Sequence, residues 1–506
     1  MSPTRPAAVL VLAAGEGTRM RSSVPKVLHR IAGRSLVGHA VAAARGLGPE
    51  HLVVVVRHGR AAVVAHLAEV APDVRTADQD EVPGTGRAVQ CGLAVLPPLS
   101  GTVVVTYGDC PLLGTLTLRR LVEVHEREGD AVTLLSHRPP DPSGLGRVVR
   151  DADGTVAAIV EEKDATPQQA AIDEANGGIY AFDAAFLVEA LHGLSDDNAA
   201  GERYLTDLVA VARGAGRGVR AVLVDDGLEL EGVNDRVQLA ALGRAMRDRL
   251  LDAWMLAGVT VVDPATTWVD VDVRLAPDVT LLPGTQLQGS TSVARGSTVG
   301  PDTTLVDCEL GEGVRVMRSH ASGARLGDGS SVGPFSYLRP GTVLGPGGRI
   351  GAYVETKNAE IGAGSKVPHL SYVGDALIGE GSNIGAATVF VNYDGVDKHR
   401  TEVGDHVRIG SDTMLVAPVS VGDGAYTAAG SVITDDVPPG AMAVGRARQR
   451  SIEGWVERKR AGTASAEAAR RAREAAGTGD GPPPDRAPSA AAGPDPGAEP
   501  NEGLDG

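Results

Sequence analysis

The chain has 506 residues, with 48 Lys and Arg against 64 Asp and Glu, which gives a formal net charge of -16 at pH 7. This length predicts two or three domains, and the acidic balance without any basic block argues against a nucleic-acid partner. No apolar run reaches the roughly 20 residues of a membrane-spanning helix, so we expect no membrane insertion. The cysteines at 91, 110 and 308 follow neither a disulfide nor a zinc spacing, which favours free thiols in a reducing, cytoplasmic compartment.

The N-terminal part of the chain, 1–231, alternates β-branched apolar runs with amphipathic stretches. The run at 7–14 leads into GEGTRM rather than a signal-peptide cleavage site, so we expect a buried first strand. HLVVVVR and GTVVVTYGD follow as further strands, with helical stretches such as LVGHAVAAARGL between them. This alternation of strands and helices predicts an α/β, Rossmann-like domain over 1–231 whose ligands bind at the carboxyl ends of parallel strands.

The second half of the chain has a different pattern. Within 232–256, apolar residues recur at helical spacing without proline after an Asn-Asp pair, which predicts a connecting helix. Over 257–460 an aliphatic residue recurs every sixth position, which predicts a parallel β-helix with three hexapeptides in each triangular coil. FVNYDGVDKHRTE (390–402) breaks this period and is expected to loop out. Residues 461–506 are rich in Ala, Pro and Gly and are expected to be disordered.

The glycine-rich segment GEGTRMRSSVPK follows the first predicted strand. It lacks the third glycine of a dinucleotide fingerprint, where Met20 stands, and it lacks the Gly-Lys-Ser/Thr of a P-loop. Two glycines with Arg19 and Lys26 can still surround a triphosphate with amides and positive charge. Asp109 ends a later strand in a Tyr-Gly-Asp turn. By itself it suits a turn cap as well as Mg²⁺, and its place at the same sheet edge favours the metal.

A histidine stands out in the β-helix segment KVPHLSYVGD. His369 is not needed in a coil of small and aliphatic residues, although a lone histidine is by default a surface or hydrogen-bonded residue. Polar residues at 339, 357, 372, 383 and 392–394 fall in nearby coils or in the predicted loop. Imidazole is the side chain best suited to act as a general base near neutral pH, so this cluster predicts a second site.

Residues 12–26 satisfy L-x-x-G-x-G-T-x-M-x-S-x-x-P-K, which resembles the signature of sugar-phosphate nucleotidylyltransferases. QDEVPGTGRA, TYGDCPLL, GLGRVV, IVEEKDA, NGGIY and EGVND extend the likeness. With the β-helix, residues 7–455 resemble the bifunctional family that joins an N-acetylglucosamine-1-phosphate uridylyltransferase to a glucosamine-1-phosphate N-acetyltransferase. The resemblance implies a left-handed β-helix and a homotrimer with coenzyme A bound between coils.

The resemblance implies that the α/β domain transfers uridylyl from UTP to N-acetylglucosamine 1-phosphate and releases pyrophosphate. Mg²⁺ would be held by Asp109 and Asn234. The residues implied to contact UTP or UDP-N-acetylglucosamine are Leu12, Ala13, Ala14, Gly15, Arg19, Lys26, Gln79, Gly84, Thr85, Tyr107, Gly108, Asp109, Gly146, Glu161, Asn176 and Asn234.

For the β-helix, the resemblance implies acetyl transfer from acetyl-CoA to glucosamine 1-phosphate, with His369 as the catalytic base. Glucosamine 1-phosphate would be bound by Arg339, Lys357, Tyr372 and Asn383. Acetyl-CoA would be bound by Ala386, Asn392, Tyr393, Ser411, Ala429 and Arg446. The chain departs from the family pattern at Pro83, Arg203 and Ala387, which puts substrate affinity in doubt.

Two other functions fit parts of the sequence. One is a sugar-1-phosphate nucleotidylyltransferase whose β-helix serves only oligomerisation, and the polar set around His369 argues against it. The other is a non-catalytic nucleotide-sugar sensor or scaffold, which we would expect to have lost Lys26, Asp109 or His369. All three residues are present.

Overall fold

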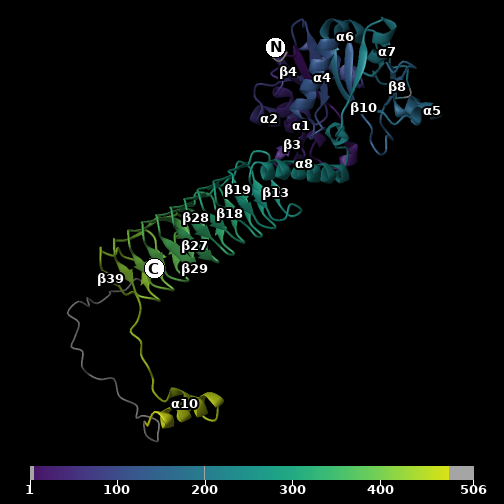
Figure 1. Ribbon diagram of the computed structural model, residues 1–506. Helices are drawn as coiled ribbons and strands as arrows, with labels where there is room; N and C mark the ends of the chain where they lie inside the picture. The colour runs from purple at the N-terminus through teal and green to yellow at the C-terminus, as the bar shows by residue number, and fades with distance from the viewer. Residues whose placement is uncertain (1–4, 199, 478–506) are drawn as a thin grey trace, which may run out of the picture. The chain divides into compact units, whose positions relative to one another are not determined.

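The computed structural model describes residues 5–198 and 200–477. It divides into two compact units, Met1–Val444 and Gly445–Gly506. The first unit begins with a mixed sheet in the strand order β11-β7-β10-β6-β1-β4-β5, to which β8 and β9 are attached through β10 (Figure 1). Strands β4, β1 and β6 are parallel, whereas β10 runs antiparallel to β6 and β7.

The strands of this domain are β1 (Ala8–Ala13), β2 (Arg30–Ile31), β3 (Arg34–Ser35), β4 (His51–Val56), β5 (Arg75–Asp78), β6 (Thr102–Tyr107), β7 (Val132–His137), β8 (Arg147–Arg150), β9 (Val156–Val160), β10 (Ala175–Asp183) and β11 (Val219–Leu223). The helices are α1 (Leu36–Arg45), α2 (Arg60–Val70), α3 (Thr85–Ala94), α4 (Thr115–Glu128), α5 (Pro167–Ala170), α6 (Ala184–Leu191) and α7 (Asp207–Gly214). The 3-10 turns are η1 (Thr18–Met20), η2 (Lys26–Leu28), η3 (Glu162–Asp164) and η4 (Gly227–Leu230).

Strand β1 shows why its sequence is continuously apolar. Leu10 packs into the core on one sheet face with α3, α6 and α7, while Val11 packs into the core on the other face with α1, α2 and α4. Successive side chains of a strand point to opposite faces, so a strand covered by helices on both faces must be apolar at every position. The predicted α/β architecture is confirmed.

Helix α8 (Arg236–Leu256) connects this domain to the β-helix. Asp235 caps it by accepting hydrogen bonds from the amides of Val237 and Gln238. The following strands pair in parallel with partners one coil further on, as Trp268 does with Gln286. The chain thus returns to the same face after about three hexapeptides, and the predicted left-handed β-helix is confirmed.

One face of the β-helix consists of β12 (Thr260–Val261), β15 (Thr280–Leu281), β18 (Thr298–Val299), β21 (Arg315–Val316), β24 (Ser331–Val332), β27 (Arg349–Ala352), β29 (Lys366–His369), β31 (Asn383–Ile384), β34 (Arg408–Ile409), β37 (Tyr426–Thr427) and β39 (Met442–Ala443). The other faces consist of β13 (Trp268–Val269), β14 (Arg274–Leu275), β16 (Gln286–Gln288), β17 (Ser292–Val293), β19 (Thr304–Val306), β20 (Glu309–Leu310), β22 (His320–Ser322), β23 (Arg325–Leu326), β25 (Tyr337–Leu338), β26 (Val343–Leu344), β28 (Glu355–Ile361), β30 (Tyr372–Ile378), β32 (Val389–Val391), β33 (Thr401–Val403), β35 (Met414–Val416), β36 (Val419–Val421) and β38 (Val432–Ile433).

The β-helix interior is a continuous apolar column because one aliphatic side chain per hexapeptide points inward, among them Leu305. An insertion is present but is shorter than the expected loop at 390–402: Phe390 lies in β32 and is fully buried in the column, and Thr401 begins β33, so only the residues between these two strands leave the coil. Asn383 pairs with Arg408, a wider separation along the chain than in the preceding pair, where Lys366 meets Asn383. Tyr393 and Lys398 form an antiparallel bridge inside this insertion. The extra residues therefore leave the coil without breaking the pairing of the strands on either side.

The C-terminal segment differs from its prediction. The last β-helix strand ends at Ala443 rather than near 460, and two helices follow in the second unit, α9 (Trp455–Lys459) and α10 (Ala464–Ala475). Helix α10 forms within the stretch expected to be disordered because alanine, arginine and glutamate favour helix, and Thr463 caps it. The rest of the predicted tail, 478–506, lies outside the described residues. None of the described helices is long and apolar enough to cross a membrane.

Candidate active sites

The glycine-rich loop after β1 holds Lys26 at the carboxyl end of the sheet. Gly17 has a φ of +69°, and a Cβ on it would lie 2.6 Å from the Cβ of Lys26. Only glycine therefore allows the loop to pack this closely on the lysine. At Gly15 a Cβ would meet nothing within 4 Å, so the backbone there borders open space. The loop thus presents its backbone to a cavity and fixes the stem of Lys26 behind it.

Lys26 joins two side chains that are far apart in the sequence. Its Nζ lies 2.5 Å from Oδ2 of Asp109 and 3.4 Å from Oδ1 of Asn234. The Lys26 and Asp109 side chains are only 11% and 18% exposed, so this ion pair is partly shielded from water. The burial of Tyr107, which precedes the turn, raises its phenol pKa and keeps it neutral.

The oxygen donors at this point suit a hard cation. Asp109 supplies a carboxylate and Asn234 an amide oxygen, both within reach of the same ammonium. Within residues 5–198 and 200–477 no three His, Cys, Asp or Glu side chains gather as a metal cage. Mg²⁺ commonly binds through one or two protein oxygens together with substrate phosphates, so the residues present fit that ion in a site that substrate completes.

Two cavities meet at Asp109 and Tyr107. The first, of about 320 Å³, is lined by Leu12, Ala13, Ala14, Gly15, Glu16, Lys26, Val27, Arg57, His58, Gln79, Pro83, Gly84, Thr85, Ala88, Tyr107, Asp109 and Glu202. The second, of about 420 Å³, is lined by Tyr107, Asp109, Cys110, His137, Pro139, Asp141, Ser143, Gly144, Leu145, Gly146, Glu161, Asn176, Gly177, Gly178, Leu230, Glu231, Gly232, Asn234 and Gln238. Of the residues predicted to contact UTP or UDP-N-acetylglucosamine, those at 12–15, Lys26 and those of the segment 79–85 line the first cavity. The second cavity is lined by the predicted residues Gly146, Glu161, Asn176 and Asn234.

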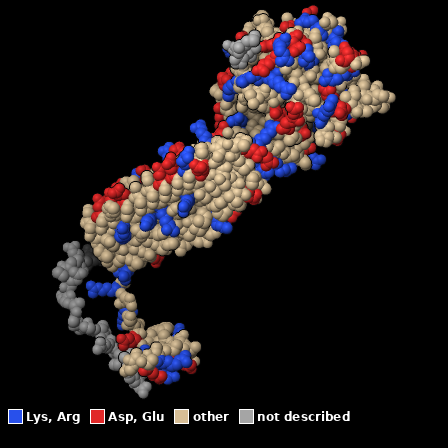
Figure 2. Space-filling model, in the orientation of Figure 1, with Lys and Arg blue, Asp and Glu red and all other residues tan. Residues whose placement is uncertain are grey.

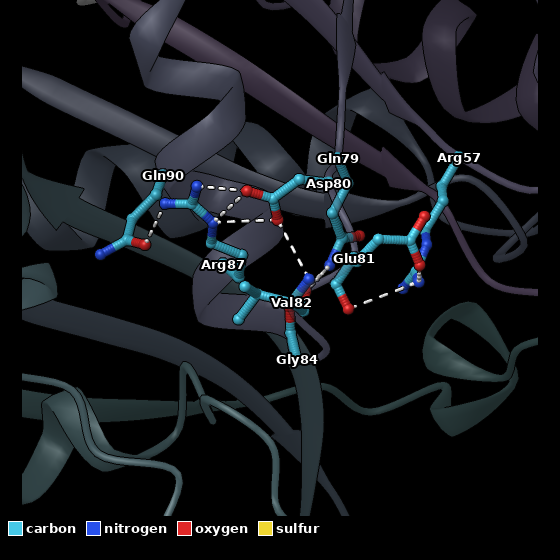
Figure 3. Close-up of polar contacts among 8 residues, drawn as sticks. All are labelled: Arg57, Gln79, Asp80, Glu81, Val82, Gly84, Arg87 and Gln90. Carbon is cyan, nitrogen blue, oxygen red and sulfur yellow. Dashed lines mark hydrogen bonds and ion pairs between the residues drawn. The ribbon is translucent and has the colours of Figure 1, made fainter.

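The segment between β5 and α3 forms one wall of the first cavity (Figure 3). The Gln79 side chain donates from Nε2 to the carbonyl oxygens of Val82 (3.1 Å) and Gly84 (3.3 Å). Its amide group is therefore committed to the loop through nitrogen, which leaves Oε1 as the acceptor available to a ligand.

Two arginine–carboxylate pairs hold this segment from either side (Figure 3). Arg87 on α3 donates from Nε to both carboxylate oxygens of Asp80 at 3.1 Å, and the bond lowers the pKa of Asp80. Asp80 also accepts from the amide of Val82 at 3.2 Å. On the other side Arg57 pairs with Glu81 at 2.9 Å, but the Glu81 side chain is 99% exposed. The Asp80 pair is the better ordered of the two because it is multidentate and less exposed.

The departures at Pro83 and Arg203 meet each other in the structure. The amide of Arg203 donates to the carbonyl of Pro83 at 3.3 Å, and the carbonyl of Arg203 accepts from the amide of Gly86 at 2.9 Å. Gly84 has a φ of +112°, and a Cβ on it would lie 2.4 Å from the Arg203 carbonyl oxygen. These contacts use only backbone atoms of Arg203, so its side-chain type does not set the position of the nucleotide segment.

The second cavity brings together Gly146, Glu161 and Asn176. Burial raises the pKa of Glu161, and the Thr206 hydroxyl donates to it at 3.3 Å. A Cβ on Gly146 would lie 3.4 Å from the Glu161 carboxylate oxygens, so an open approach there depends on a small residue. The amide of Asn176 donates to the carbonyl of Gly146 at 2.8 Å, which places the two strands side by side.

Not every predicted residue lines these cavities. Arg19 is exposed in η1 and lines neither, and Gly108 is buried, with its amide donating to the Leu12 carbonyl at 2.9 Å. Sequence reasoning missed Arg57 and His137, which follow or end β4 and β7. The rule that ligands bind at the carboxyl ends of parallel strands could have indicated both positions.

The β-helix site centres on the corner between β29 and β30. His369 ends β29 and is exposed, and Tyr372 begins β30 opposite Glu355 of the preceding coil. Lys357 lies opposite Gly374 in the same pair of strands. Lys398 of the insertion lies within hydrogen-bonding reach of Lys357, and its ammonium lowers the pKa of Lys357. The insertion therefore adds a cation that sequence analysis did not single out.

Further polar groups surround this corner. Arg339 donates from Nη1 to Glu355 at 3.1 Å. Asn392 is buried and donates to Asp375 at 2.5 Å, while the Tyr393 hydroxyl donates to the carbonyl of Gly395 at 2.6 Å. Asn383 begins β31, where it pairs with Lys366.

Three of the predicted acetyl-CoA residues, Ala386, Ser411 and Ala429, fall on one corner of successive coils, whereas Asn392 and Tyr393 follow β32 at the start of the insertion. The amide of Ala387 donates to the carbonyl of His369 at 3.2 Å, Asp412 donates to Ala386 at 2.7 Å, and Gly430 donates to Ser411 at 2.8 Å. Ala429 directly precedes Gly430 in that row. The φ of Ala387 is +59°, a left-handed conformation that explains why glycine is expected there. Arg446 lies in the other compact unit, 445–506, so the structure does not group it with this row.

Comparison with known proteins agrees with both halves of the fold. Residues 9–206 match the family described as MobA-like NTP transferase domain, and residues 400–435 match bacterial transferase hexapeptide (six repeats). "Bifunctional protein GlmU" of Kineococcus radiotolerans is 62% identical over 473 residues, 93% of this chain and 96% of the relative. The chain belongs to the bifunctional GlmU family.

Other GlmU relatives are nearly as similar. The Streptomyces avermitilis protein is 60% identical, covering 93% of this chain and 98% of its own, and the Corynebacterium glutamicum protein is 56% identical, covering 91% and 96%. The prediction of a bifunctional enzyme, with a nucleotidyltransferase domain followed by a hexapeptide-repeat transferase domain, is confirmed by this GlmU membership.

Proposed function

We propose that this GlmU-family chain makes UDP-N-acetylglucosamine in two steps at two separate sites. The β-helix site would acetylate glucosamine 1-phosphate, and the α/β site would transfer uridylyl from UTP to the resulting N-acetylglucosamine 1-phosphate. The observation that carries the proposal is the junction of two cavities at Asp109, beside Lys26 and Asn234. A nucleotide in one cavity and a sugar phosphate in the other would place their reacting phosphates at this junction.

For uridylyl transfer, the first cavity binds UTP with its base against Gln79–Gly84. The sugar phosphate oxygen attacks the α-phosphorus in line, and pyrophosphate leaves. Lys26 supplies a positive charge beside the phosphates, where charge builds up in the transition state. Mg²⁺ held by Asp109 and Asn234 would neutralise phosphate charge. Glu161 and Asn176 orient the sugar, so that its phosphate points toward Asp109.

For acetyl transfer, His369 accepts a proton from the amine of glucosamine 1-phosphate as the nitrogen attacks the thioester carbonyl carbon. A carbon–nitrogen bond forms, the carbon–sulfur bond breaks, and coenzyme A leaves as the thiol after taking up that proton. Arg339 and Lys357 bind the sugar phosphate, and Lys398 adds charge to the same place. Ala386, Ser411 and Ala429 form the row along which acetyl-CoA would lie.

We further propose that the chain is a homotrimer in the cytoplasm. Phe335, Tyr353 and Leu370 are 51%, 60% and 60% exposed, and the first two rings stack at 5.3 Å. Most of the β-helix face that Figure 2 presents is uncharged, and the charged side chains in its middle are Lys and Arg. An exposed apolar column next to His369 favours burial against another copy. The described cysteines are free thiols, which supports a reducing compartment.

Light scattering after size exclusion tests the oligomer. Tyr353→Glu is expected to reduce the mass from that of three chains to that of one. Leu116→Glu is the matched control, because Leu116 is 77% exposed on α4 and should leave the mass unchanged. A Tyr353→Glu protein that keeps the wild-type mass would place the contact between copies elsewhere.

The functional test supplies glucosamine 1-phosphate, acetyl-CoA, UTP and Mg²⁺ and follows UDP-N-acetylglucosamine. His369→Ala should abolish acetyl transfer and leave uridylyl transfer from supplied N-acetylglucosamine 1-phosphate largely intact. Asp109→Ala should do the reverse. Unchanged acetyl transfer in His369→Ala would show that another group is the base, and a wild-type protein without acetyl transfer would leave the β-helix with an oligomerising role only.

A further inference from the structure

One polar side chain in the second cavity has no part in the mechanism above. His137 ends β7 and is 3% exposed, yet it lines the cavity that also contains Glu161 and Asn176. It lies opposite Ala175 in the pairing of β7 with β10, one position from the pair formed by Ser136 and Asn176. Successive residues of a strand point to opposite faces, so the His137 and Asn176 side chains leave the sheet on different faces, and both line the same cavity at the end of the strands.

The ring nitrogens of His137 lack hydrogen-bond partners among the residues that the structure describes. Nδ1 is buried and unpaired, and a Cβ on Gly227 would lie 2.9 Å from it, so this nitrogen faces backbone at the start of η4. Nε2 of His137 also forms no hydrogen bond with the described residues. It is therefore the ring nitrogen that is available to a ligand in the cavity. Burying a polar nitrogen without a hydrogen-bond partner is unfavourable, which makes this arrangement unusual for a purely structural side chain.

Other buried histidines of the same domain behave differently. His39 bonds through Nε2 to the carbonyl of Ile31 at 2.8 Å, and His125 bonds through Nδ1 to the Thr133 hydroxyl at 2.9 Å. Burial lowers the pKa of His137, so the ring is neutral and carries one donor and one acceptor nitrogen. A hydroxyl can donate as well as accept, so it satisfies Nε2 in either tautomer.

The neighbouring polar groups that are proposed to orient the sugar also have partners within the chain, which His137 does not. Asn176 donates to the Tyr180 hydroxyl at 2.7 Å and accepts from the amide of Gly178 at 3.0 Å. Glu161 accepts from Thr206. We propose that His137 is a substrate-binding residue that hydrogen-bonds a hydroxyl of the sugar in the uridylyl-transfer site. This inference rests on the proposed function, because it takes the ligand of the second cavity to be a sugar 1-phosphate.

The test compares His137→Ala with His125→Ala in the full-length protein. His137→Ala should raise the KM for N-acetylglucosamine 1-phosphate about tenfold, as expected for one lost hydrogen bond in a shielded site. The KM for UTP and the rate of acetyl transfer should stay within about twofold of wild type. His125→Ala should lower the melting temperature without changing either KM, because its partner lies outside both cavities.

Deoxy analogues of N-acetylglucosamine 1-phosphate identify the hydroxyl. One analogue should bind about tenfold more weakly than the parent sugar to the wild type but equally to His137→Ala, since the contact is already lost. If His137→Ala does not fold, His137→Asn undergoes the same measurements. A variant with the wild-type sugar KM overturns the role of His137, whereas a wild-type protein that makes no UDP-N-acetylglucosamine overturns the proposed function itself.

Discussion

Gly84→Ala is expected to damage the nucleotide segment through a backbone collision. A Cβ at this position would lie 2.4 Å from the carbonyl oxygen and 2.5 Å from the nitrogen of Arg203, and an ordinary contact needs at least 3.4 Å. The segment must therefore retreat by 3.4 - 2.4 = 1.0 Å. That movement stretches the bonds that join Arg203 to Pro83 and Gly86.

The expected cost follows from these contacts. The φ of +112° is strongly unfavourable for alanine and adds about 1–2 kcal/mol, and two weakened backbone bonds add about 1 kcal/mol each. A total of about 3–4 kcal/mol corresponds to a rise of roughly 150-fold to 900-fold in the KM for UTP if the segment must regain its position to bind. The assay is steady-state uridylyl transfer with varied UTP, together with urea unfolding.

Gly101→Ala separates the collision from the backbone penalty. Gly101 has a φ of +97° in the same domain, but a Cβ there meets nothing within 4 Å. This variant should lose about 1–2 kcal/mol of unfolding free energy and keep the wild-type KM for UTP. Equal KM values for the two variants would refute the argument that contact with Arg203 positions the nucleotide segment.

Two further predictions concern charged side chains at the cavities. Asp80→Asn should raise the KM for UTP about threefold to fivefold with little change in kcat, because the bonds from Arg87 weaken. Glu81→Gln should change neither the KM nor kcat, since the Glu81 carboxylate is 99% exposed. Equal effects of the two substitutions in steady-state kinetics would contradict this prediction. Glu161→Gln should stabilise the protein at pH 7 in urea unfolding while weakening sugar binding. Burial raises the pKa of Glu161, so the native state holds a proton on this carboxyl at pH values where the unfolded state has already lost it. The free energy of unfolding therefore falls as the pH rises through the raised pKa. The stabilisation should shrink as the pH falls through that raised pKa, and a gain that does not depend on pH would show that ionisation of Glu161 is not its cause.

Much of the fold is encoded in short-range patterns. The continuously apolar β1 predicts a strand buried on both faces, and the six-residue period predicts the coil, because each reflects how side chains alternate between interior and surface. Helix α10 does not follow from apolar content, because its sequence has few large apolar residues and therefore predicts disorder. Alanine, arginine and glutamate nevertheless favour a helix, and a capped helix of these residues can form with little apolar burial.

The grouping of the site depends on contacts over long sequence separations. Lys26 meets Asp109 and Asn234 across 83 and 208 residues, since β6 pairs directly with β1 and the chain returns to that edge before α8. The motif could indicate the types of these residues, but only strand order brings them to one point. Their catalytic roles stay proposals.

Local spacing and residue chemistry are enough to specify the two architectures, and they predict the nucleotide loop and His369 as a candidate base. Only the tertiary structure decided that Arg19 lies outside both cavities, that the backbone of Arg203 supports Gly84, and that His137 has no partner among the described residues. Those facts depend on which surfaces pack together, and packing between distant segments leaves no period or motif in the chain.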